Sequence, residues 1–275
     1  MNTEKKLRSL RTRSLVVTVF ALLLVASGLT QLGFGGVAIG EEYERIEKLE
    51  ELTRQRTFYG YQSQQAAFQN EYNRSSSAFF LQGRFLSATQ NTSWTDPGVI
   101  AFGANLLSGL GFLVAAMMWV WRAHANLTEA GVRAKFTPGR ALAAYLLPVA
   151  NLILPFEAMR ELYNRSHHEP EDFVDSTVED VTAWFTALVV GLLIFSAMLV
   201  KFILDAGTAL IIMTPLWMEF AILAFAMILI LGAAWLFAGL ARKITAAQEE
   251  FLPEIVVTAP EQEAPQRMSV NVLSA

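Results

Sequence analysis

The sequence contains no cysteine and only three histidines among its 275 residues. The absence of cysteine excludes disulfides, thiolate metal sites and cysteine nucleophiles. The histidines, His124, His167 and His168, leave little material for a metal centre, and the adjacent pair lacks the i,i+4 spacing of a helical zinc motif. We therefore expect neither a metal nor a cofactor.

Charged residues are also scarce, at 17% of the chain against roughly a quarter in a soluble domain. Hydrophobic residues make up 53%, the mean hydropathy is +0.37, and the apolar residues gather in long runs. No large basic surface is visible, so the sequence gives no support to nucleic-acid binding. This composition is typical of a protein whose main partner is the lipid bilayer.

Four apolar stretches reach the roughly 20 helical residues that a bilayer crossing needs. They are residues 15–39, 99–121, 181–200 and 216–240. Each is expected to be helical because hydrocarbon offers the backbone no hydrogen-bond partner. The first resembles a signal peptide, but its apolar run continues well beyond Gly28, too far for a signal core of about 7–15 residues. We interpret it as an uncleaved anchor.

A fifth apolar segment, residues 141–156, is shorter and contains Pro148, Asn151 and Pro155. Proline removes a helical hydrogen bond, so we expect a broken helix that dips into the inner leaflet and returns. The predicted fold class is all-α: a polytopic membrane bundle of four spanning helices plus one broken or re-entrant helix.

Lysine and arginine near the membrane ends predict the orientation. Residues 1–14 carry five of them, residues 122–140 carry four, Arg242 and Lys243 follow the fourth span, and residues 205–215 carry none. If the first span runs from inside to outside, every segment rich in lysine and arginine lies on the cytoplasmic side, where such residues are enriched. Both termini are then cytoplasmic.

The chain divides into four predicted regions. Residues 1–40 form a cytoplasmic leader and the first transmembrane helix, and residues 41–97 form an extracytoplasmic helical hairpin. The hairpin begins as a continuation of the first helix, because Glu41–Arg45 and Glu44–Lys48 are acid-first i,i+4 pairs. Residues 98–248 form the membrane bundle core, and the acidic, proline-containing residues 249–275 form a disordered cytoplasmic tail.

The most distinctive motifs follow the second span. They are Trp121-Arg122-Ala123, Asn126-Leu127, Phe136-Thr137-Pro138-Gly139, Pro148-Val149-Ala150-Asn151-Leu152 and Pro155-Phe156. This pattern resembles the bacterial membrane family called domain of unknown function 4328, from the second span to the fourth. Thr137 replaces the family's usual serine, and Phe156 stands where tyrosine is common. The resemblance implies a helical membrane fold in the bacterial cytoplasmic membrane, and it implies no reaction.

Several polar residues are predicted to meet near the inner headgroup level. They are Arg122, Asn126, Asn151, Glu157, Arg160 and Glu161. Polar groups at membrane depth are costly and face protein or water, so the cluster could be a small site for a substrate or a lipid headgroup. In the structural interpretation, which we favour, Arg122 and Asn151 cap backbone groups freed by Pro148 and Pro155.

The sequence favours a non-enzymatic protein with a scaffold, sensing or partner-contact role. Its expected partners are the bilayer, anionic lipid headgroups near Arg122, Arg133, Lys135 and Arg140, and a protein that contacts residues 41–97. The alternative is a small transporter or channel subunit that uses the broken helix around Pro148 and Pro155. An enzyme ranks third, because Gly-x-Ser-x-Gly, His-Glu-x-x-His and paired intramembrane aspartates are all missing.

Overall fold

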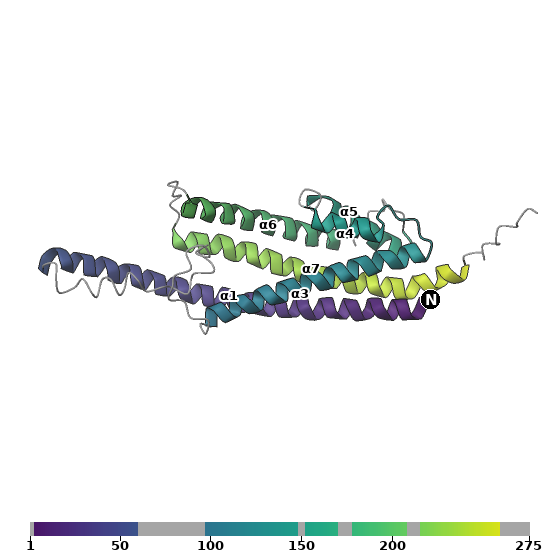
Figure 1. Ribbon diagram of the computed structural model, residues 1–275, viewed down its shortest axis with the longest axis horizontal. Coiled ribbons are helices and arrows are strands. Elements are labelled where there is room, and N and C mark those ends of the chain that lie inside the picture. Colours follow the sequence, from purple (N-terminus) through teal and green to yellow (C-terminus); the bar gives the residue numbers. More distant parts are fainter. Residues whose placement is uncertain (1–2, 60–96, 148–151, 170–177, 208–214, 259–275) are drawn as a thin grey trace, which may run out of the picture.

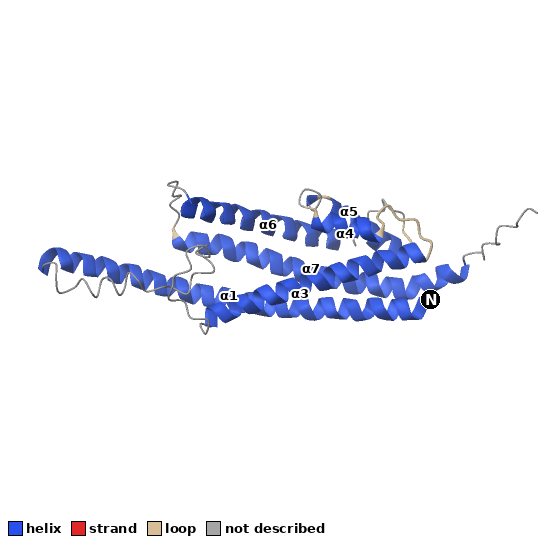
Figure 2. Cartoon of the chain, viewed as in Figure 1, coloured by secondary structure: helices blue, strands red, loops and turns tan. Residues whose placement is uncertain are grey.

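The computed structural model describes residues 3–59, 97–147, 152–169, 178–207 and 215–258, which are almost entirely helical and contain no strand (Figure 2). The helices are α1 (Thr3–Tyr59), α3 (Pro97–Glu129), α4 (Pro138–Leu146), α5 (Leu154–Ser166), α6 (Val178–Gly207) and α7 (Leu216–Thr258). The predicted all-α class is confirmed.

Four of these helices, α1, α3, α6 and α7, are long and apolar enough to cross a membrane, as the sequence predicted. Their outward surfaces carry large apolar side chains, among them Leu15, Leu107 and Leu193, which are 62%, 71% and 57% exposed. Such a surface is stable in hydrocarbon, where the helical backbone satisfies its own hydrogen bonds.

The four long helices form a row in the order α3, α1, α7, α6, and α3 also contacts α7 directly. α1 packs along both α3 and α7, α6 packs along α7, and α3 and α6 share no extended contact (Figure 1). Gly28 marks a close approach of α1 to α7, because a Cβ at that position would lie 2.7 Å from Leu231 Cδ1. The row therefore does not close into a ring, and one side between α3 and α6 is left open.

The short helices α4 and α5 cover one end of this row, which we call the capped end. It also holds the start of α1 and the C-terminal parts of α3 and α7 (Figure 1). At the opposite end, which we call the far end, α1 projects well beyond the other helices. The break predicted for residues 141–156 falls between Leu146, where α4 ends, and Leu154, where α5 begins with Pro155 in its first turn.

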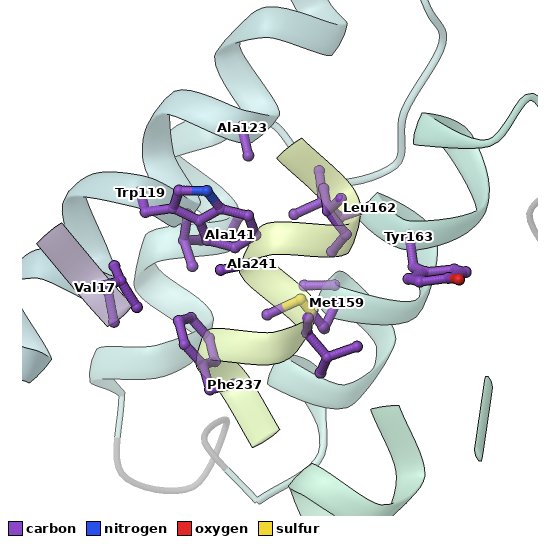
Figure 3. Close-up of a cluster of buried hydrophobic side chains, with 14 of the residues drawn as sticks. Val17, Trp119, Ala123, Ala141, Met159, Leu162, Tyr163, Phe237 and Ala241 are labelled. Carbon is purple, nitrogen blue, oxygen red and sulfur yellow. The ribbon is translucent and has the colours of Figure 1, made fainter. Parts of the chain in front are cut away.

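A hydrophobic cluster joins the cap to the long helices (Figure 3). Trp119 of α3 and Met159 and Leu162 of α5 are fully buried, and the Trp119 ring lies edge-on to Phe237 of α7 at 5.7 Å. Val17 of α1 completes the contact. Because packed interiors are dense and resist rearrangement, this cluster fixes the positions of the polar groups around it.

Candidate functional site: the capped end of the bundle

Gln248 on α7 connects three helices through its side-chain amide and is completely buried. Its Nε2 donates to the carbonyl of Ala123 on α3 at 3.2 Å and to Ser166 Oγ on α5 at 3.1 Å. Its Oε1 accepts from Asn126 Nδ2 at 3.3 Å. A primary amide has two donors, and both are used here within the protein. We call this group of residues the Gln248 network.

Glu161 on α5 holds the loop that leads into α4. Glu161 as a whole is 3% exposed, and its carboxylate accepts the backbone N–H groups of Lys135 and Phe136, the latter at 3.0 Å. Hydrogen bonds to an ionised acceptor are stronger than neutral ones. Thr137, two residues after Lys135, caps α4 by accepting the N–H of Arg140 at 3.4 Å. Pro138 lies in the first turn of this helix. The loop is thus fixed where it enters α4.

Basic and acidic side chains meet where α1 lies beside the end of α3. Lys6 Nζ is 2.5 Å from Glu129 Oε2, and Arg122 Nη1 is 3.7 Å from Glu129 Oε1. Arg13 donates to the carbonyl of Met118 at 2.7 Å. The Glu129 carboxylate therefore pairs with two cationic groups, and with Arg13 close to Arg122 the three basic side chains outnumber this one acid.

The residues predicted to form one polar site are distributed over separate interactions. Arg122 and Asn126 are one turn apart on α3, but Arg122 contacts Glu129 while Asn126 contacts Gln248. Glu157 forms an ion pair with Lys135 at 3.3 Å, on a surface where both side chains are partly exposed. These side chains therefore lie in one region, the capped end, but each bonds to a different partner.

The remaining predicted residues lie elsewhere in the cap. Arg160 lies over the ring of Phe156, with its guanidinium carbon 5.8 Å from the ring centroid. Pro155 is buried in the first turn of α5. Pro148 and Asn151 lie outside the described residues, so the capping of freed backbone groups by Arg122 and Asn151 stays a prediction.

Sequence reasoning missed Gln248, Ser166 and Thr245. Thr245 accepts the indole N–H of Trp119 at 3.1 Å and is 4% exposed. A helical repeat in the sequence could have identified this buried face. It continues beyond residue 240, the predicted end of the fourth span, through the buried positions Ala241, Ile244, Thr245, Gln248 and Leu252. Reading that period past residue 240 would have placed Gln248 on a buried face.

A second cluster of polar side chains joins α1 to α3 within their long apolar stretches. Asn105 Nδ2 donates to Gln31 Oε1 at 2.6 Å, and Ser27 Oγ lies 2.9 Å from Ser108 Oγ. Ser27 also donates to Asn105 Oδ1 at 3.4 Å. Polar side chains in spanning helices commonly join neighbouring helices in this way. Asn105 is therefore an interhelical contact.

An apolar cleft of about 480 Å³ lies on the open side of the row. Leu106, Leu110 and Leu113 of α3 form one wall, Leu188 and Leu192 of α6 form the other, and α7 forms the back. Tyr145 of α4 and Trp184 of α6 line the cleft at the capped end, with ring centroids 6.4 Å apart. The lining offers little hydrogen-bonding capacity, so an ion or polar solute would lose its hydration there without replacement.

The far end contains one further ion pair. Lys201 of α6 lies 2.7 Å from Glu219 of α7, and the two side chains are only 11% and 13% exposed. Because both side chains are largely buried, each charge depends on the other for its neutralisation.

No group of three or more metal-ligating side chains occurs within the described ranges. The domain of unknown function DUF4328 matches residues 95–246, which comprise α3, α4, α5, α6 and most of α7. No curated protein and no solved structure matches the chain. Because the match covers more than half of the sequence, the chain belongs to the DUF4328 family.

Proposed function

We propose that this chain is a non-enzymatic, multi-pass protein of the bacterial cytoplasmic membrane that acts as a scaffold. It contacts anionic lipid headgroups at its capped end and a protein partner through residues 41–97. The Gln248 network is the observation that carries the proposal, because the Gln248 amide uses its donors and its oxygen within the protein, on Ala123, Ser166 and Asn126. A catalytic or substrate site would instead present polar groups toward an open space.

The distribution of basic residues supports a cytoplasmic capped end. Arg133 and Arg140 lie exposed on the cap, and Arg242 and Lys243 lie exposed on the same end of α7. The N-terminal turns of α1, which carry five more basic residues in positions 1–14, start there too (Figure 1). Cytoplasmic segments are enriched in such residues.

The exposed arginines of the cap are the proposed contacts for anionic lipids. A basic residue near a negatively charged leaflet contributes about 1 kcal/mol. We expect Arg133→Gln with Arg140→Gln to reduce the preference of the protein for anionic over zwitterionic lipid by roughly that amount per residue, measured by lipid exchange in nanodiscs. Lys48→Gln on the projecting part of α1 is the control and should change nothing.

The projecting part of α1 supports a partner on the opposite side. From Gly40 to Tyr59 the helix continues for about 30 Å at 1.5 Å per residue. Glu44 and Arg54 are exposed along it. A helix of this length reaches well past the headgroups and presents a surface away from the membrane.

Two measurements test the proposal in the cysteine-free background. In spheroplasts, a membrane-impermeant maleimide should label Arg54→Cys at once and label Gly139→Cys only after permeabilisation. A photo-crosslinker at Glu44 should give one discrete product in cells, whereas the same group at the lipid-facing Leu107 should give none. The reverse labelling pattern, or identical crosslinking at both positions, contradicts the proposal.

Transport is the second candidate, because the cleft between α3 and α6 opens at the level of the spanning helices. Because the cleft lining offers little hydrogen-bonding capacity, this candidate predicts flux of an apolar solute in proteoliposomes above that of protein-free vesicles. The scaffold predicts none. Flux that disappears when the cleft is filled by Leu192→Trp would contradict the scaffold proposal and support transport.

A further inference from the structure

The volume of the cleft between α3 and α6 fits a hydrocarbon chain. An apolar cavity of about 150 Å³ accepts benzene, which has six carbon atoms. At about 480 Å³ the cleft is roughly three times larger, which corresponds to about 18–20 carbon atoms on the same scale. A single long acyl chain has this size.

The shape of the cleft agrees with its volume. Along α3 the lining extends from Asn105 to Met117, which is about 18 Å at 1.5 Å per residue. This is somewhat more than half of a hydrocarbon core of roughly 30 Å. Small residues at the back, Ala233 and Ala234 of α7, leave the space that the two leucine-rich walls enclose. An elongated apolar space open toward lipid selects an extended chain over a compact molecule.

Tyr145 lines the capped end of the cleft. The Tyr145 hydroxyl is buried and has no hydrogen-bond partner in the part of the chain that is described. Trp184, whose ring lies beside Tyr145, is one turn below Asp180, or about 6 Å along α6. Asp180 forms an ion pair with the exposed Lys243. Tyr145 therefore lies just beneath a charged layer, where the ester carbonyls of a phospholipid are found at the edge of the hydrocarbon core.

We propose that the cleft holds one acyl chain of a phospholipid from the leaflet at the capped end, and that the ester carbonyl accepts a hydrogen bond from the Tyr145 hydroxyl. The bound lipid occupies the open side of the row and joins α3 to α6. This inference does not depend on which compartment the capped end faces, nor on a protein partner.

The test counts the lipids that purified protein retains. The protein is exchanged into a lipid-free mild detergent and analysed by native mass spectrometry, with lipid extraction to identify what is bound. Wild type should retain one phospholipid per chain. Leu113→Trp with Leu192→Trp, which fills the cleft, should reduce that retention at least tenfold. Val114→Trp with Leu193→Trp, at neighbouring lipid-facing positions outside the cleft, should retain it.

Tyr145→Phe keeps the ring and removes only the hydroxyl, so it tests the hydrogen bond even where the filled variant does not fold. One neutral hydrogen bond corresponds to a loss in affinity of about five-fold. The proposal is overturned by a wild-type protein without retained phospholipid, by equal retention in the filled and control pairs, or by unchanged retention in Tyr145→Phe. Retention of a free fatty acid, or of a second copy of the chain that excludes lipid, also overturns it.

Discussion

Replacing Glu161 with glutamine tests whether this carboxylate fixes the cap. The change preserves size and removes the charge, so it isolates the two hydrogen bonds from Lys135 and Phe136. A hydrogen bond to a charged group contributes about 1.5–3 kcal/mol, and a buried donor left without an acceptor costs about 1–3 kcal/mol. The glutamine amide retains one oxygen but turns an N–H group toward the second backbone donor. We expect Glu161→Gln to lower the free energy of unfolding by about 2–4 kcal/mol.

Glu157→Gln is the matched control, because Glu157 lies one turn earlier on the same face of α5 and forms a partly exposed ion pair with Lys135. Exposed pairs contribute about 0–1 kcal/mol, so this variant should be nearly as stable as wild type. Unfolding in mixed micelles, followed by tryptophan fluorescence, measures both. Trypsin adds a local measurement, since Arg133 and Lys135 lie in the loop that Glu161 holds. If the two variants lose equal stability and cleave at equal rates, Glu161 does not fix the cap.

Two further predictions concern the packing of α6 against α7. A side chain at Gly191 has no room, since its Cβ would lie 2.9 Å from Ile230 Cγ1. We therefore expect Gly191→Leu to lower the melting temperature by several degrees. Gly232 is exposed and has open space around it, so Gly232→Leu should leave the melting temperature unchanged. Lys201→Met removes the buried ammonium that pairs with Glu219 and should cost about 3–5 kcal/mol, while adding Glu219→Met should recover most of that loss. A double-mutant cycle on micellar unfolding measures the recovery, and strict additivity would mean that the pair is not coupled.

The long apolar helices could be predicted because length and hydropathy are properties of one continuous stretch. Length and hydropathy identified α1, α3, α6 and α7 without any knowledge of their neighbours. The break between α4 and α5 was equally local, since proline restricts the backbone wherever it occurs. These features depend on the bilayer and the peptide group, both of which are the same for every sequence.

The polar contacts could not be predicted in the same way. Gln248 bonds to Ser166 and Ala123, which are 82 and 125 residues away in the chain. Such pairs depend on how far each helix is rotated and how the row is ordered, and several arrangements satisfy the same hydropathy. Glu161 presents a related difficulty, because its partners are backbone N–H groups that look alike at every position.

The position of α1 has a consequence for how the family region should be expressed and studied. The DUF4328 match begins at residue 95, whereas α1 ends at Tyr59 and yet lies between α3 and α7 in the row. A fragment limited to the matched residues would leave α3 and α7 without their shared neighbour and would present Asn105 and Ser108 to lipid. The unit of sequence similarity is thus smaller than the unit of folding, and an α1 peptide supplied in trans should complete it.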